Sequence, residues 1–451
     1  MQEDSIQEHI DNQTGSVFKN RDFLLLWIAQ AVSQTAQNAI WFALMVVVED
    51  TTRSGTQLSF AVLTTVIPGI VLGMIAGVFV DRMNKKTVLV TTNLLRAAAV
   101  LGYLLYAQAI AFVYLVNLIF CSISQFFGPA EAATIPRVVP KQRLITANSL
   151  FNLTFTGSQM AGIVLLAPWI LKLFGASTLF IMAAGMYVIA TVLVYLIPPG
   201  EEPHKPLSSL RKETLIDDMW TEIKEGWSFI ASDVRVSYAV RHLTLIAGLM
   251  LVMSMIAPRF VVSVLGISAE DSVYIMAPAG VGVLIGTMTM SRLARRFGKT
   301  ALVNVGLVTL GISMFIMSIL RWTDIHLGAW FQSGPVLPGV VGIVSVMMVL
   351  AAFLGFEAAL VMIPSQTVLM ERTPVPIRGR IFAVQIMLGN VASILPLVFL
   401  GGLADFIGVT RVIAIIAAGI ITLGWLAIRN NHEAVPEPAL SGASTQRSTS
   451  E

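Results

Sequence analysis

Residues 77–86 read GVFVDRMNKK, and residues 291–296 read SRLARR. When the two stretches are aligned on the first arginine, the matched pairs are Asp81 with Ser291, Arg82 with Arg292, Lys85 with Arg295 and Lys86 with Arg296. Each stretch follows the second of six hydrophobic segments in its own part of the chain. Weak similarity at equivalent places is the mark of a duplicated membrane protein. The sequence therefore predicts two related halves.

The hydrophobic segments around these stretches are long enough to cross a membrane. The chain has 451 residues, of which 56% are hydrophobic and 12% charged, whereas soluble domains carry about 25% charged residues. A spanning helix needs about 20 apolar residues. Such segments lie near 22–48, 58–80, 88–108, 110–130, 147–171, 176–197, 240–264, 273–291, 300–320, 338–363, 380–403 and 409–428. We therefore predict an all-α membrane protein with twelve transmembrane helices in two pseudo-symmetric six-helix halves.

The polar stretches between and beyond these segments divide the chain into five parts. These are an N-terminal segment (1–21), a first bundle (22–197), a linker (198–235), a second bundle (236–428) and a polar tail predicted to be disordered (429–451). Within the linker, residues 210–230 place apolar and tryptophan side chains at helical spacing opposite charged ones. This pattern predicts an amphipathic helix at the membrane interface, although a plain tether between the bundles remains an alternative.

The basic residues indicate how the chain is oriented. If the N-terminus is cytoplasmic, about 24 of the 29 Lys and Arg residues fall on the cytoplasmic side, as the positive-inside rule requires. The exceptions are Arg53, Lys172, Arg259, Arg321 and Arg411. We therefore expect a multi-pass protein of the cell inner (plasma) membrane with both termini in the cytoplasm. The formal net charge of +3 is too small to indicate a nucleic-acid partner.

The stretch at 77–86 also resembles the signature loop of the major facilitator superfamily, with the spacing GxxxDRxxKK. That resemblance implies a latch that holds the two halves together on the cytoplasmic side and opens when the carrier turns inward. Its residues would be Gly77, Asp81, Arg82, Lys85 and Lys86, with Ser291, Arg292, Arg295 and Arg296 in the second half. In this role Gly77 would let two helices approach closely. The alternative is a tight basic turn that only follows the positive-inside rule.

Further stretches are similar to the efflux branch of that family, which includes macrolide exporters, siderophore exporters and lysophospholipid flippases. They include residues 127–130 (FGPA), 378–382 (RGRIF) and 403–405 (LAD). The chain departs from many relatives in span one, where it has Gln37 and Asn38 in place of an acidic residue, and in span five, where residues 157–162 lack the antiporter proline.

Ionisable groups inside membrane spans are costly, so each is a candidate functional residue. Glu131 and Glu357 are each followed by two alanines and lie at similar places in spans four and ten. They are candidates for binding protons or a cationic substrate, or for pairing with loop arginines near the inner face. Arg259, in the outer part of span seven, either belongs to the substrate path or snorkels to the outer interface.

Amide side chains supply further candidates for the substrate path. Gln34 and Asn38 share one face of span one because they are four residues apart, and Asn390 of span eleven could join them. The same amides would serve equally well as hydrogen-bonding contacts between packed helices. Methionines in spans seven and ten, such as Met250 and Met253, would suit an apolar pocket, but packing or lipid-facing positions are the expected interpretation.

No catalytic residue set, metal site, cofactor or Walker loop is evident, and Cys121 is the only cysteine. We therefore expect no enzyme. The predicted function is a secondary active antiporter that exports a small amphipathic compound, such as a drug or siderophore, by proton-coupled alternating access. Its expected partners are this small-molecule substrate, protons and the lipid bilayer, and it is expected to be a monomer. Alternatives are a lysophospholipid flippase, a nutrient uptake carrier and a non-transporting membrane receptor or scaffold.

Overall fold

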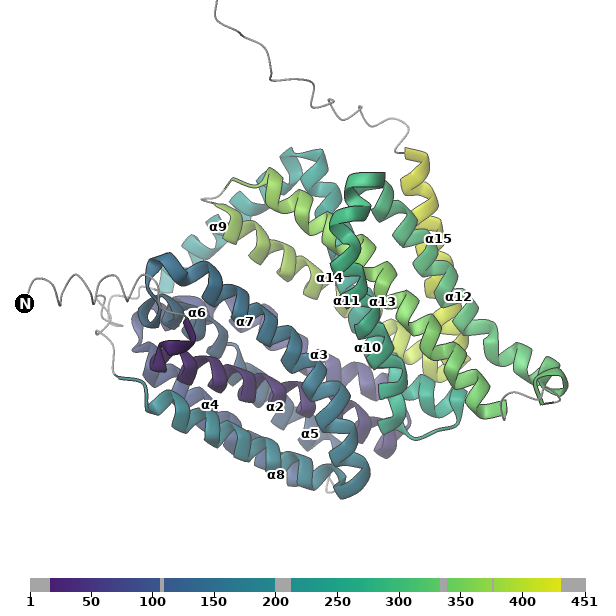
Figure 1. Cartoon of the computed structure of the whole chain (residues 1–451), viewed down its shortest axis with the longest axis horizontal. Helices are drawn as coiled ribbons and strands as arrows, with labels where there is room; N and C mark the ends of the chain where they lie inside the picture. The colour runs from purple at the N-terminus through teal and green to yellow at the C-terminus, as the bar shows by residue number, and fades with distance from the viewer. Residues whose placement is uncertain (1–16, 106–108, 199–211, 333–338, 375–376, 431–451) are drawn as a thin grey trace, which may run out of the picture.

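Helices form every regular element that the computed structural model describes, in residues 17–105, 109–198, 212–332, 339–374 and 377–430 (Figure 1). The first half contains α2 (Arg21–Thr52), α3 (Gly55–Arg82), α4 (Lys85–Gly102), α5 (Ile110–Ser124), α6 (Phe127–Val138), α7 (Leu144–Gln159), η4 (Met160–Leu166) and α8 (Ala167–Tyr195). The second half contains α10 (Val234–Phe260), η7 (Ala269–Ser272), α11 (Val273–Phe297), α12 (Lys299–Gln332), α13 (Gly339–Arg372), α14 (Arg378–Ile407) and α15 (Val409–Asn430).

The linker contributes one helix, α9 (Lys212–Ser232), which packs against α10 and α14 of the second half. Ile230 is buried against that half, whereas Trp220 and Trp227 are exposed. The rest of the predicted linker helix and most of the two predicted end segments, 1–21 and 429–451, lie outside the described residues.

The described helices include eleven stretches long and apolar enough to cross a membrane. One of them, Thr146–Tyr195, has 50 residues and would be about 75 Å long if it were straight. Because the hydrocarbon core is only about 30 Å thick, this stretch must cross twice. Gly175 supplies the turn, with φ 79° and ψ 173°, a conformation that glycine adopts without steric cost. The all-α class and the two-half architecture are confirmed, and the eleven stretches are consistent with twelve crossings.

Capping side chains start several of these helices where the hydrophobic segments begin. The Asn20 side chain accepts hydrogen bonds from the backbone of Asp22 and Phe23 and so caps α2. Asn84 and Asp233 cap α4 and α10 in the same way. Each cap satisfies N–H groups that have no partner inside the helix, so the helix boundaries lie close to those expected from hydropathy.

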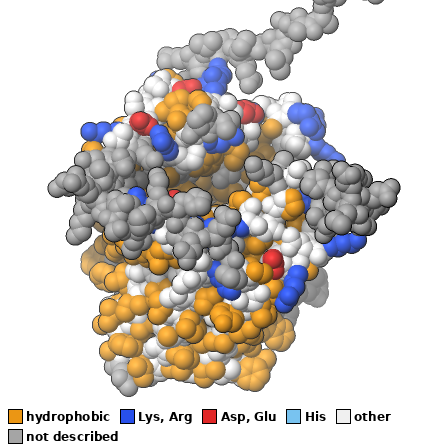
Figure 2. All heavy atoms as spheres, turned by 90° about the vertical axis from the view of Figure 1, so that its left-hand side faces the viewer, with side chains coloured by type: hydrophobic (Ala, Val, Ile, Leu, Met, Phe, Trp, Pro, Cys, Tyr) orange, Lys and Arg blue, Asp and Glu red, His pale blue; other side chains and the backbone are white. Residues whose placement is uncertain are grey.

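The two ends of the bundle differ in how close the halves are. We call the end that carries Arg82, Arg372 and Arg378 the basic end, and the other the opposite end. Across the halves, α3 packs along α14 and α10, whereas α6 and α7 pack on elements of their own half. Figure 2 looks onto the basic end and shows a shadowed apolar depression between the two halves. The halves therefore meet toward the opposite end and diverge toward the basic end.

The space around the glycines of α3 shows that α3 and α14 diverge toward the basic end. A Cβ added at Gly55 would lie 2.6 Å from the carbonyl oxygen of Gly401 on α14. Farther along α3, a Cβ at Gly69 would lie 3.8 Å from Nδ2 of Asn390 on α14, and at Gly77 no described atom would lie within 4 Å. The close helix approach expected at Gly77 is therefore not made in this conformation, since α3 and α14 have already separated there.

This difference predicts opposite effects of one substitution at two positions. A Leu side chain at Gly401 would collide with the hydroxyl of Ser59 and with the backbone of α3, so Gly401→Leu should lower the free energy of unfolding by about 1–3 kcal/mol. Gly77→Leu should leave it unchanged or slightly higher, because leucine favours helix over glycine. Cys121 is buried and is the only cysteine, so a thiol-reactive dye reports thermal unfolding directly. Equal melting temperatures for the two variants would contradict the packing.

Candidate functional site

A cavity of about 350 Å³ lies between the two halves. The first half contributes residues of α7 and η4, among them Gln159 and Met160, and the second half contributes α10 to α13 and one residue of α15. Six methionines line it: Met160, Met250, Met253, Met276, Met314 and Met317. Thioether side chains are flexible and polarizable, so they adapt to apolar ligands of different shapes. The expectation that the methionines only pack or face lipid is wrong for Met250 and Met253.

Polar groups in this cavity are few. Gln159 and Ser254 supply the polar side chains of the lining, and no described lining residue is ionisable. Such a wall, mostly apolar with a few convergent polar groups, is typical of small-molecule sites. It would hold a largely apolar compound and give it one or two hydrogen bonds.

Glu357 lies directly behind this cavity on α13. Its side chain is buried and accepts a 3.0 Å hydrogen bond from Ser313 of α12, while its Oε2 has no hydrogen-bond partner in the structure. The next residues on each helix, Ala358 and Met314, line the cavity. A carboxylate in this position is one residue away from the ligand space rather than in it.

Glu131 lies inside the first half, on α6, where Arg96 of α4 interacts with it electrostatically. Arg96 is almost fully buried, donates to the carbonyl of Ser124 at 3.1 Å, and lies over the ring of Phe127 at 4.4 Å. Neither Arg96 Nε nor Glu131 Oε1 has a hydrogen-bond partner in the structure. Sequence analysis missed Arg96, although an arginine in the middle of the segment 88–108 was a visible signal.

The amide candidates are divided between two places. Asn38 donates to the backbone carbonyl of Gln34 at 2.8 Å and lies against η4 at Gly162, where a Cβ would come within 2.7 Å of the Asn38 Cβ. Asn390 and Gln125 instead flank Gly69 of α3, near mid-helix. Gln34 and Asn38 are joined by this hydrogen bond, whereas Asn390 lies beside α3, and a substrate path that includes all three residues stays a prediction.

Arg259 lies at the opposite end of the bundle and joins the two halves. One guanidinium nitrogen is 3.5 Å from Glu49 at the end of α2, and the other is 3.0 Å from Asp405 at the end of α14. Glu49 is buried, and Arg259 and Asp405 are partly buried. We call these three residues the charge lock. Sequence analysis proposed only Arg259 from this set, because Glu49 and Asp405 stand at the ends of their hydrophobic segments.

Asp405 also caps α3, which belongs to the other half. Its carboxylate accepts hydrogen bonds from the N–H groups of Gly55 and Thr56, at 2.6 and 2.9 Å, and from the hydroxyls of Ser54 and Thr56, both at 2.7 Å. A carboxylate at a helix N-terminus satisfies free N–H groups and is favoured by the helix dipole. The cap exists only while the opposite end is closed.

The predicted latch residues at the basic end make contacts within their own half. Lys85 donates to the carbonyl oxygen of Asp81 at 2.6 Å, and the ammonium of Lys86 lies 5.0 Å from the ring of Tyr195. Arg82 Nη1 is buried without a hydrogen-bond partner in the structure. In the second half, Arg296 lies over the ring of Phe297. The latch across the two halves stays a prediction for a different conformation.

The charge lock predicts how the conformational equilibrium responds to substitution. Asp405→Ala removes four hydrogen bonds across the halves, together with the ion pair to Arg259 that orients Asp405 within the second half. Hydrogen bonds to charged groups contribute about 1.5–3 kcal/mol each. We therefore expect the population of this conformation to fall by about tenfold or more. Spin labels at exposed Gln142 and Arg372, at the basic end of the two halves, would show shorter distances.

Lys172 provides the control, because it also pairs across the halves at this end, with Asp271 at 2.9 Å, but its side chain is 59% exposed. Exposed pairs contribute about 0–1 kcal/mol, so Lys172→Gln should leave the distance distribution nearly unchanged. If Asp405→Ala and Lys172→Gln behave alike, the charge lock does not hold the opposite end closed.

Comparison with known proteins places this arrangement in a family. The sequence model of the Major Facilitator Superfamily matches residues 26–347. The chain is 24% identical over 379 residues to an uncharacterized MFS-type transporter of Bacillus subtilis, covering 83% of this chain and 84% of the relative. It is 25% identical over 397 residues to the multidrug efflux pump Tap of Mycobacterium tuberculosis, covering 83% and 85%. The macrolide efflux protein A of Streptococcus pyogenes is 23% identical over 309 residues, covering 66% and 73%.

Solved structures share the fold at low sequence identity. The nucleoside transporter NupG superimposes with a TM-score of 0.63 at 16% identity, covering 90% of this chain and 98% of that one. A bacterial homologue of the human lysosomal transporter Spinster, in an inward-facing and unoccupied conformation, gives 0.65 at 13% identity, covering 93% and 98%. From the family match, the relatives and the shared fold, the chain belongs to the Major Facilitator Superfamily and is a multi-pass membrane transporter of small molecules.

Proposed function

We propose that this transporter exports a small amphipathic compound, such as a drug or a siderophore, in exchange for protons. The observation that carries the proposal is the methionine-rich cavity of about 350 Å³ between the halves. Its wall suits an apolar compound with few polar groups, and two relatives of the chain are named as efflux proteins. The transporter would act as a monomer, since one chain contains both halves of the cavity.

The orientation of the proposed transporter follows from its basic end. Lysines and arginines gather there in both halves, and loops rich in these residues stay in the cytoplasm. We therefore place the basic end and both termini in the cytoplasm, with the chain in the cell inner (plasma) membrane. The conformation described here then corresponds to the inward-open state of an alternating-access cycle, with the charge lock closing the outer side.

The buried carboxylates are the candidates for coupling to protons. Glu357 is adjacent to the cavity lining through Ala358, and Ser313, its hydrogen-bond donor, is adjacent to Met314. Protonation of Glu357 would change the packing of α12 against α13 at the place where both helices border the cavity. Glu131, near Arg96, is the corresponding candidate in the first half. The headgroup contact that a flippase would require of Arg259 is occupied in this conformation by Glu49 and Asp405.

Export and its coupling are tested together in cells that lack their main efflux pumps. Cells that produce the transporter should accumulate less of at least one compound in a panel of macrolides, siderophores and lipophilic dyes, and a protonophore should abolish the difference. Glu357→Gln should bring accumulation to the level of control cells, because the glutamine keeps the shape but cannot exchange a proton.

Glu371→Gln is the matched control for Glu357→Gln, since Glu371 lies on the same helix but is exposed and pairs with Lys299. It should export normally at equal membrane abundance. Export that persists after complete collapse of the proton gradient would eliminate the coupling, and normal export by Glu357→Gln would remove this residue from it.

Closure of the basic end gives a second prediction. In an outward-open state α14 must approach the part of α3 that carries Gly77, which is open in the present conformation. Gly77→Leu should therefore fold normally but lose transport, because the added side chain blocks that approach. The control is Gly185→Leu on α8, where an exposed helical glycine also has open space around it. Full transport by Gly77→Leu would show that the two helices do not meet there.

A further inference from the structure

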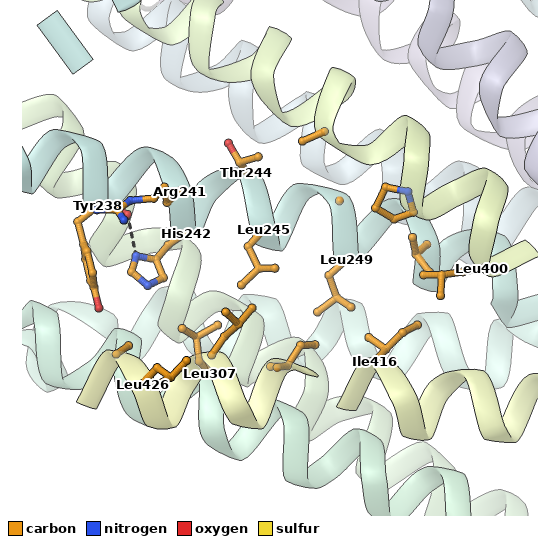
Figure 3. Close-up of a pocket in the computed structure, with 17 residues that line it drawn as sticks. Tyr238, Arg241, His242, Thr244, Leu245, Leu249, Leu307, Leu400, Ile416 and Leu426 are labelled. Atoms are coloured by element: carbon orange, nitrogen blue, oxygen red, sulfur yellow. Dashed lines mark hydrogen bonds between the residues drawn. The ribbon is translucent and has the colours of Figure 1, made fainter. Parts of the chain in front are cut away.

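A second cavity, of about 530 Å³, lies inside the second half and is separate in position from the one between the halves. It is bordered by α10, α14 and α15, with Leu307 of α12 behind it (Figure 3). The two cavities share a single lining residue, Leu249. The proposed substrate path therefore does not account for this second space.

The helices that border this cavity leave a groove between them. In the second half α10 packs mainly along α13 and α14, and α15 packs mainly along α12, so α10 and α15 touch only slightly. The apolar side chains that face the resulting groove, including Leu245, Leu400 and Ile416, are half-buried rather than buried. Leu426 is 40% exposed. Within a membrane, such a row of side chains is covered by acyl chains or by another apolar molecule.

The groove has a polar end. Tyr238, Arg241 and His242 lie together at one end of the drawn cavity, and the leucine and isoleucine side chains extend from there toward Leu400 and Ile416 (Figure 3). Arg241 is exposed, and its guanidinium lies 5.4 Å from the Tyr238 ring. In the described part of the chain no carboxylate forms an ion pair with it. Because α10 begins at Val234, this polar end lies at the basic end of the bundle.

The length of the groove corresponds to one leaflet. On α10 the lining runs from Tyr238 to Val252, and the part from Arg241 to Val252 covers the same length as the lining on α15, from Ala427 to Ile416. Eleven residues of rise correspond to about 16 Å of helix, which is about half of the 30 Å hydrocarbon core. The groove is therefore as deep as one acyl chain reaches from a headgroup whose phosphate lies near Arg241.

We propose that this groove binds one anionic phospholipid from the leaflet at the basic end. The phosphate would accept hydrogen bonds from the guanidinium of Arg241, a planar donor that suits phosphate oxygens, and one acyl chain would lie along Leu245, Leu400 and Ile416. Basic pockets between transmembrane helices on the cytoplasmic side are suited to anionic headgroups. The lipid would fill the space between α10 and α15 and hold the second half as a rigid unit while the halves move.

Native mass spectrometry of the purified full-length transporter tests this with phosphatidylglycerol and phosphatidylcholine as probes. We expect one phosphatidylglycerol per chain, bound more tightly than phosphatidylcholine. Arg241→Gln should weaken phosphatidylglycerol binding by about tenfold or more and leave phosphatidylcholine binding unchanged. Ala392→Phe, which adds a ring to an exposed lining position on α14, should reduce the binding of both lipids.

Two matched controls make the test specific. Arg429→Gln removes a cation at the basic end of α15 that lies over Trp425 and does not line the groove. Val391→Phe adds a ring at the exposed neighbour of Ala392, outside the lining. Both should bind phosphatidylglycerol as the unsubstituted chain does, and thiol-dye melting curves should show all four variants folded.

Several outcomes would overturn the proposal. Equal binding of the two lipids would mean that the groove accepts acyl chains without recognising charge. An Arg429→Gln effect as large as that of Arg241→Gln would mean diffuse attraction to the membrane surface. Unchanged binding in a folded Ala392→Phe variant would place the lipid elsewhere, and a dimer mass lost in Ala392→Phe would make the groove an interface between two copies. None of these results depends on whether the chain exports a drug.

Discussion

The hydrogen bonds of Asp405 connect the two halves, because the acceptor belongs to the second half and the donors belong to the first. The carboxylate lies at the end of α14. It accepts hydrogen bonds from N–H and hydroxyl groups of residues 54–56 at the start of α3. Arg259 then neutralises the acid and extends the contact to Glu49. Opening this end exposes the first turn of α3 and separates the buried Glu49 from Arg259, so compensating interactions must form elsewhere.

The arrangement separates the ligand space from the groups that carry charge. The cavity between the halves has an apolar wall, while Glu357 and Glu131 each lie within the helix packing of one half. A charged side chain inside the cavity would lose its hydration when an apolar ligand bound against it, which costs free energy. Glu357 lies one residue behind the cavity lining, so a change in its charge affects the ligand only through the packing of α12 against α13. This indirect coupling does not require a ligand of one particular shape.

Local sequence signals account for most of the fold and for little of the site. Hydropathy located the helices because each span satisfies its own backbone hydrogen bonds, and Gly175 marks the turn between the predicted fifth and sixth spans. The charge lock was largely missed, since Asp405 meets its partners across about 350 residues of sequence and lies at a span end. Arg96 was visible in its span, but its neighbours Phe127 and Glu131 come from another helix that hydropathy cannot place.

The series of glycines on α3 has a consequence for how far the transporter opens. The space beside α3 grows from Gly55 to Gly77. The two halves therefore cross near Gly55 and diverge toward Gly77, and the volume of the side chains between them limits how closely they can approach. A larger side chain near Gly55 would change the angle between the halves in this conformation. A larger side chain near Gly77 would limit how far the halves can close at the basic end. Related chains could therefore adjust which side is open at rest through the size of a few side chains, with the charges at both ends left as they are.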